Sequence, residues 1–166
     1  MKKNLTILSL AAIILFLSGC WKSNNIVEYN DSFVAVVKDC TDSTQTLYNV
    51  FHADWSTIDS IWDALQESIG ICQNSQTKAS KLWDFDKDST LKDAVIDLLS
   101  TEVQYLEKFW NTKRYRNIDN ITSVDQEEYD AVVNDLYQSE EILNSKFNSL
   151  QTIQEGFAAK HGLKLA

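Results

Sequence analysis

The sequence predicts an all-α protein, an up-down-up-down antiparallel four-helix bundle, and three observations predict it. Helix-breaking residues are almost missing, because the 166 residues include no proline and four glycines. Apolar residues recur every seven positions over four long segments, as they do along one face of a packed helix. Only short connections separate these segments, and short links place successive helices antiparallel.

Each predicted helix carries its own apolar stripe, and the fourth stripe is the most regular. The expected helices cover residues 26–52, 56–83, 90–116 and 123–161. The residues that mark the stripes are Ile26, Phe33, Cys40 and Leu47 in the first; Ile58, Leu65, Cys72 and Ala79 in the second; Leu91, Val95, Leu98, Leu99, Tyr105, Leu106, Phe109 and Trp110 in the third; and Tyr129, Leu136, Leu143, Leu150 and Phe157 in the fourth. These stripes should meet in one core.

Some polar and aromatic residues have an expected place in this bundle. Glu102 interrupts the third stripe, and a carboxylate there is expected to pair with a lysine or arginine. Trp62, Trp83 and Trp110 are expected in the core or at its edge. Capping boxes at the helix starts are predicted for the pairs Ser56 and Asp59, Thr90 and Asp93, and Ser123 and Gln126.

The first twenty residues have the features of a secretory signal. Lys2 and Lys3 precede the apolar run Leu5–Leu17, which is too short to span a bilayer. The run ends in Leu17-Ser18-Gly19-Cys20, which resembles the lipobox of bacterial lipoproteins, in which the cysteine becomes the lipidated first residue. The expected organisation is a signal peptide over residues 1–19, a lipidated terminus and tether over residues 20–25, and a bundle domain over residues 26–166.

The negative net charge of the chain limits the classes of partner that we expect. Without Lys2 and Lys3, 13 basic residues stand against 24 acidic ones, a net charge of −11. Nucleic acid and an anionic membrane surface would both repel such a chain, so membrane attachment should depend on acyl chains at Cys20. Trp21 stands where the inner-membrane retention signal of enterobacterial lipoproteins has aspartate. The outer membrane is therefore the expected location, with the face left open.

Cys40 and Cys72 are the only cysteines after Cys20. They lie at similar distances from the turn near residue 55, on adjacent helices, and an exported compartment permits disulfides. Helix axes pack about 8–10 Å apart, whereas a disulfide needs Cα atoms within about 7 Å, which small neighbours such as Ala35 would allow. A disulfide and two buried free thiols both fit the sequence.

Three aspartates resemble the opening of a calcium loop. Asp84, Asp86 and Asp88 have the spacing of the first ligands of an EF-hand. Ser89 and Val95 then occupy the positions of the required glycine and glutamate. No metal site is therefore predicted, and the aspartates are expected to favour the start of the third helix.

One basic and aromatic cluster stands at the end of the third helix. It consists of Lys113, Arg114, Tyr115 and Arg116. Its cations suit the negative end of the helix dipole. The first helix begins near the membrane anchor and runs outward, so the loop after the third helix should face away from the membrane. The cluster is therefore also a candidate docking patch for an acidic partner or a glycan.

Known catalytic patterns are missing from the sequence. His52 and His161 are the only histidines, and neither follows a glutamate by three residues as in di-iron bundles. We expect no cofactor, metal or catalytic residue, but a non-enzymatic protein that binds an envelope protein or a cell-wall component. The alternative is a pocket between the helices for a small ligand or a reaction, which a polar group inside the apolar core would favour.

The motifs together resemble a family. Tyr29-Asn30-Asp31 lies early in the first helix, and Phe157-Ala158-Ala159-Lys160-His161-Gly162 ends the last. With the lipobox, they make the chain similar to a group of uncharacterised bacterial surface lipoproteins first recognised in spirochaetes and found also in Bacteroidetes. The resemblance implies a membrane-anchored helical bundle and carries over no catalytic residue. The two motifs should meet at one end of the bundle and join the first helix to the last.

Overall fold

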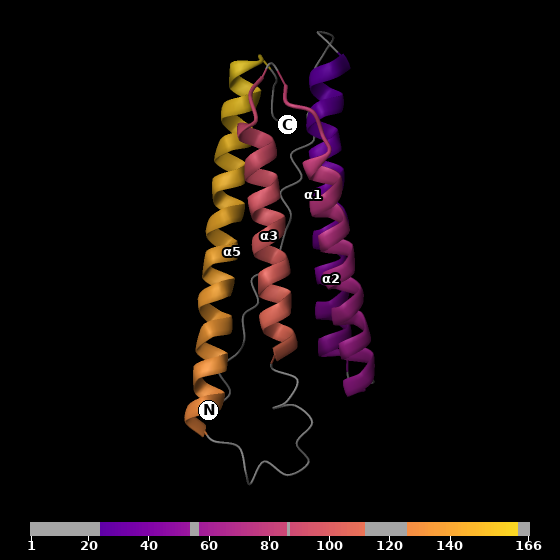
Figure 1. Ribbon diagram of the computed structural model, residues 1–166, viewed down its shortest axis with the longest axis vertical. Coiled ribbons are helices and arrows are strands. Elements are labelled where there is room, and N and C mark those ends of the chain that lie inside the picture. The colour runs from indigo at the N-terminus through magenta and orange to yellow at the C-terminus, as the bar shows by residue number, and fades with distance from the viewer. Residues whose placement is uncertain (1–23, 54–56, 86, 112–125, 163–166) are drawn as a thin grey trace.

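The computed structural model describes residues 24–53, 57–85, 87–111 and 126–162. They form four helices, α1 (Asn24–His52), α2 (Ile58–Ser80), α3 (Thr90–Asn111) and α5 (Gln126–Lys160), and successive helices run in opposite directions (Figure 1). The predicted all-α, antiparallel four-helix bundle is confirmed. No helix in these described ranges has a stretch long and apolar enough to cross a membrane.

Two helix starts differ from the predicted caps. The N-cap of α2 is Thr57, whose hydroxyl accepts the N–H of Ser60, while the Ser60 hydroxyl accepts the N–H of Thr57. At α3, Thr90 is already helical and donates its N–H to the Asp88 carboxylate. The box predicted at Ser56 therefore lies one residue later, at Thr57, and the box predicted at Thr90 is wrong because Thr90 is not the N-cap. The third, at Ser123, lies outside the described residues.

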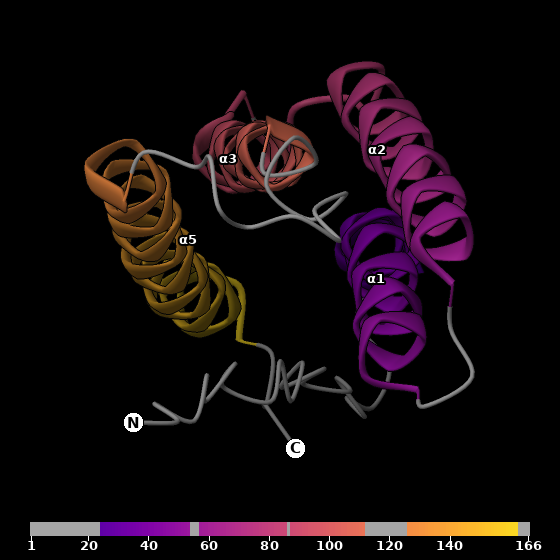
Figure 2. The same cartoon turned by 90° about the horizontal axis from the view of Figure 1, so that it is seen from below.

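The four helices form an arc, and α1 and α5 are its two ends (Figure 2). Helix α1 packs on α2, α2 on α3 and α3 on α5, with a smaller contact between α1 and α3. Among the described helices, α1 and α5 share no comparable interface. Neighbours along the chain therefore supply most of the packing, and the first and last helices each have a less covered side.

The core confirms the first three stripes more fully than the fourth. Phe33, Leu65 and Leu99 are buried, and so are most stripe residues of α1, α2 and α3. On α5, Leu143 is buried, whereas Tyr129 is 42% exposed. The most regular stripe is thus the least buried, because α5 packs mainly on α3.

The tryptophans lie where the sequence places them. Trp62 is buried, and its ring centroid is 5.6 Å from that of Trp110, which is partly buried. Trp83 is 46% exposed at the edge of the core, 5.7 Å from the ring of Tyr29. All three are therefore core or core-edge residues.

Helix α1 begins and α5 ends at the same end of the bundle (Figure 1), and the two family-like motifs are in contact there. The buried ring of Tyr29 lies 5.6 Å from that of Phe157 and 5.4 Å from that of Phe85. Beside it, Asn30 Oδ1 accepts a 2.9 Å hydrogen bond from Gln154 Nε2. We call Tyr29, Asn30, Phe85, Gln154 and Phe157 the terminal latch. It confirms that the first and last helices are joined at this end.

Candidate functional site

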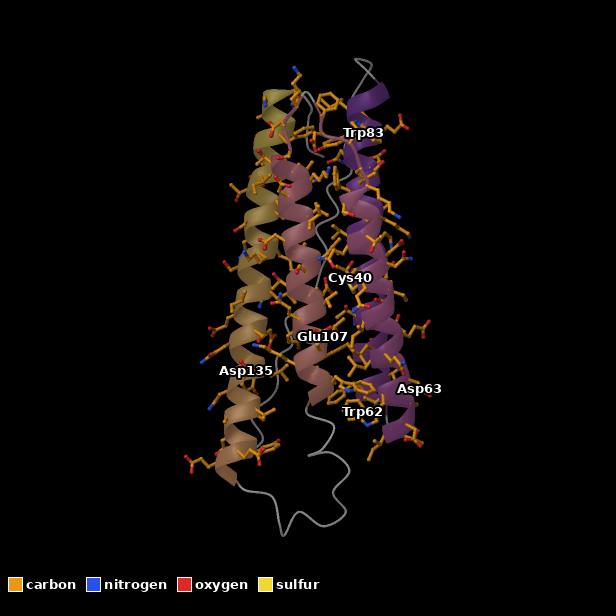
Figure 3. All side chains as sticks on the ribbon, in the orientation of Figure 1. Cys40, Trp62, Asp63, Trp83, Glu107 and Asp135 are labelled. Carbon is orange, nitrogen blue, oxygen red and sulfur yellow. A yellow bond between two sulfur atoms is a disulfide. The ribbon has the colours of Figure 1, made fainter. Side chains whose placement is uncertain are left out.

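A disulfide between Cys40 and Cys72 joins α1 to α2 near the middle of the bundle, where Figure 3 labels Cys40. The two Cα atoms are 4.6 Å apart, closer than ordinary helix packing allows. Small side chains permit this approach, but Ala35 is exposed and is not among them. Two small buried residues lie beside the bridge: Ser43 Oγ is 3.9 Å from Cys72 Sγ, and Ser68 Oγ donates a hydrogen bond to the carbonyl oxygen of Ser43.

Glu102 lies beside this disulfide and is completely buried. One carboxylate oxygen accepts a 2.7 Å hydrogen bond from the Thr44 hydroxyl, and the other has no hydrogen-bond partner among the described residues. Burial raises the pKa of Glu102 to about 7, although the hydrogen bond from Thr44 lowers it. No lysine or arginine in the described ranges reaches it, so the predicted ion pair is wrong.

The sulfur atoms of Cys40 and Cys72 and a carboxylate oxygen of Glu102 all lie within 4.8 Å of one another. Thiolates bind metal ions, but sulfurs in a disulfide carry no negative charge. With the bridge formed, the cluster is therefore a polar layer inside the core and not a metal site.

A groove lies next to this polar layer, between α1, α3 and α5. Its volume is about 50 Å³. Thr44 connects the two features, because it lines the groove and donates its hydroxyl to Glu102. The lining residues are Thr44, Leu47, Tyr48 and Phe51 from α1; Tyr105, Leu106 and Phe109 from α3; and Glu140, Leu143 and Asn144 from α5. The groove follows from the arc, because no helix among the described ranges covers the facing sides of α1 and α5.

The electrostatics of the groove are negative. Glu140 is partly buried, and burial together with the neighbouring charge of Glu141 raises its pKa. Burial also raises the pKa of Tyr105 to about 12, and the charges of Glu140 and Glu102 add to the effect. Tyr105 therefore stays neutral, and the carboxylates dominate the local potential.

Nearby lysines are engaged elsewhere. Lys108 Nζ lies 2.8 Å from the carboxylate of Asp135, which Figure 3 labels on α5, and 2.8 Å from Ser139 Oγ. Lys146 Nζ lies 2.6 Å from the carboxylate of Asp97. Within the described ranges, Glu140 has no hydrogen bond or ion pair. The carboxylate of Glu140 in the groove therefore has no counter-charge among the described residues.

The structure also places the residues that the sequence singled out. Asp84 forms an ion pair with Lys92, and Asp88 forms one with Lys160, so these carboxylates stabilise the α2–α3 connection. Asp86, Cys20 and the cluster Lys113–Arg116 lie outside the described residues.

Sequence reasoning identified Glu102 but missed the groove beside it. Two signals were available. Tyr105 and Phe109 follow Glu102 at helical spacing in the third stripe, and Glu140 stands three residues before Leu143 in the fourth. Both place a carboxylate against an apolar seam.

No family model matches the sequence, and neither a curated protein nor a solved structure matches it significantly. The function is therefore inferred from the residues and geometry of the molecule alone.

Proposed function

We propose that the protein is a lipid-anchored component of the bacterial cell envelope that binds a partner or ligand without chemically changing it. The likeness of Leu17–Cys20 to a lipobox supports anchoring through Cys20, and Trp21 supports the outer membrane as its location. Two or more acyl chains on a single cysteine attach a protein stably to a membrane. A net charge of −9 for the whole chain favours this route over attraction to anionic lipid.

The groove between α1, α3 and α5 is the observation that carries the binding part of the proposal. Ligand sites in proteins are concave and mostly apolar, with a few polar groups that orient the ligand. Leu47, Leu106 and Leu143 supply the apolar surface, while Glu140 and Asn144 supply polar groups. Among the described lining residues there is no histidine, cysteine or lysine, which favours binding over catalysis.

Two kinds of ligand are candidates for this groove. An envelope protein or a cell-wall component is the first candidate, and the basic cluster Lys113–Arg116 remains a second docking patch for such a partner. A small molecule is the second candidate. The small volume of the groove, about 50 Å³, and the carboxylate of Glu102 inside the core favour the small molecule at this site.

Anchoring is tested with Cys20→Ala. The substitution should abolish incorporation of labelled palmitate and move the protein from the membrane fraction to the soluble fraction. A Cys20→Ala protein that still fractionates with membranes would contradict the proposed anchor.

Binding is tested in intact cells with a photoreactive amino acid at Asn144, which lines the groove, and at Asn148, an exposed position one turn further along α5. Mass spectrometry of the irradiated protein should show a defined adduct at position 144 and none at position 148. A protein adduct would indicate a macromolecular partner, and a small mass increment would indicate a small ligand. Identical results at both positions would overturn the assignment of the groove.

A further inference from the structure

We propose that the groove between α1, α3 and α5 binds an organic ammonium ion that carries an apolar substituent. The inference rests on the proposed function, because it names the ligand class of the same site. Three features of the lining point to this chemistry: aromatic rings, a carboxylate without a cation, and an apolar floor.

Aromatic side chains from two helices border the groove. Tyr48 and Phe51 come from α1, and Tyr105 and Phe109 come from α3. The rings of Phe51 and Phe109 meet edge to face, with centroids 5.6 Å apart. Tyr105 is only partly buried, so part of its ring borders open space. Aromatic faces attract ammonium groups, and clusters of such rings bind methylated ammonium ions.

The Glu140 carboxylate supplies the charge that an ammonium ion would neutralise. It lines the groove without an ion pair to any described residue, and its charge acts on Tyr105. Glu102 lies behind Thr44 with one oxygen unpartnered and adds to the negative charge when it is ionised. A partly buried carboxylate is costly without a counter-charge. Lys108 and Lys146 pair with Asp135 and Asp97, so neither of these described lysines compensates the charge of Glu140, as a cationic ligand would.

The apolar floor selects among cations. Leu47, Leu106 and Leu143 are buried in the lining and offer no oxygen ligands, and Glu140 is the only carboxylate among the lining residues, whereas a calcium ion takes about six to eight oxygen ligands. A methylated or primary ammonium instead gains contact with the leucines, and because the groove encloses only about 50 Å³, the alkyl or aryl group lies largely at its open side. The negative phosphate beside the ammonium of a phospholipid headgroup would be repelled by the carboxylate of Glu140. The geometry therefore favours a free organic amine over a lipid.

The probe for this site is benzyltrimethylammonium, which combines a methylated ammonium with one aromatic ring. Its binding to the purified full-length protein is measured by calorimetry, with phenylacetate as the anion of similar shape and tetramethylammonium as the head group alone. We expect a dissociation constant on the order of 0.1–1 mM for the probe and at least about tenfold weaker binding of the two analogues. Phenylacetate that binds as tightly as the cation would overturn the proposal.

Two variants and a control locate the site. Glu140→Gln should weaken probe binding about tenfold, and Tyr105→Leu should weaken it severalfold. Glu107→Gln makes the same charge change at an exposed position of α3 outside the groove, where Figure 3 labels Glu107, and should leave binding within about twofold. Circular dichroism verifies that each variant is folded. Equal loss in Glu140→Gln and Glu107→Gln would show a nonspecific charge effect and refute the site.

Short-chain phosphatidylcholine below its micellar concentration identifies the source of the ammonium. We expect no competition with the probe, as for a free amine as the ligand; competition would overturn the preference for a free amine and indicate a lipid headgroup. Failure of every cation to bind, together with a defined adduct at Asn144, would reject the ammonium and keep the groove. Failure of the adduct would reject the groove itself.

Discussion

Replacing Glu102 by glutamine should remove a large part of the pH dependence of stability. Burial raises the pKa of Glu102 from an ordinary 4.5 to about 7 in the folded protein. Between these values the folded state binds more protons than the unfolded state, so stability falls as the pH rises. Below about pH 4.5 the Glu102 carboxyl is protonated in both states and costs the folded protein no stability. Above about pH 7 it is ionised in both states, and the full loss of stability is present. Each pKa unit corresponds to about 1.4 kcal/mol, which makes the loss roughly 3 kcal/mol.

Urea unfolding of the wild type and of Glu102→Gln, from about pH 4 to about pH 8, measures this loss. The wild type should lose roughly 3 kcal/mol more than the variant across the range, because the glutamine amide cannot ionise and its oxygen still accepts from Thr44. Glu107→Gln, at an exposed position, should follow the wild type. If the free energy of unfolding of the wild type and of Glu102→Gln changed in parallel with pH, the reasoning would be refuted. The pKa of Glu102 would then be the same in the folded and the unfolded state.

Other substitutions test the packing. Without reductant, Cys40 and Cys72 should resist alkylation after unfolding, and replacing both by serine should cost about 4 kcal/mol, because the bridge spans 32 residues; two alkylated thiols would contradict the bridge. Tyr29→Ala should cost roughly 3–5 kcal/mol in thermal or chemical unfolding, since Tyr29 is buried in the terminal latch; a loss below about 1 kcal/mol would contradict the latch. Lys87 has a φ of 64°, a left-handed conformation that glycine adopts more easily than lysine, so Lys87→Gly should stabilise the protein by about 1 kcal/mol. The control Lys81→Gly, at a φ of −88°, should not stabilise it. Equal effects of the two substitutions on the midpoint of urea unfolding would refute this prediction.

The number and direction of the helices could be predicted because both depend on local features. A seven-residue repeat without proline specifies a helix with one apolar face, and short connections reverse its direction. How far that face is buried depends on which other helices pack against it, and the repeat within one helix does not specify them. Tyr129 shows the difference: it belongs to the most regular repeat, that of α5, yet it is 42% exposed.

The polar layer was predictable in part. Counting residues from the turn near residue 55 places Cys40 and Cys72 at similar heights, and the structure joins them. The close approach depends on buried serines of two helices, which no count along one helix reveals. Glu102 was identified by its place in a stripe, but its partner was wrong. The structure holds it through Thr44 and a raised pKa, so no cation is needed when the carboxyl is protonated.

The groove could not be predicted because it depends on a missing long-range contact. Leu47 and Leu143 each read as ordinary core residues in their own helices. Only the arc, which separates α1 from α5, turns their shared side into a site (Figure 2). Glu140 then becomes a lining residue, although its place beside Leu143 resembles many seam positions.

Methyl NMR during titration with benzyltrimethylammonium tests the groove most directly. Leu47, Leu106 and Leu143 line it, whereas Leu65 and Leu91 are buried in the core away from its lining. Saturable shifts confined to the methyl groups of the first three leucines, and lost in Glu140→Gln, are the expected result. Shifts spread evenly over all five leucines, or none at millimolar probe, would contradict a cation-binding groove between α1, α3 and α5.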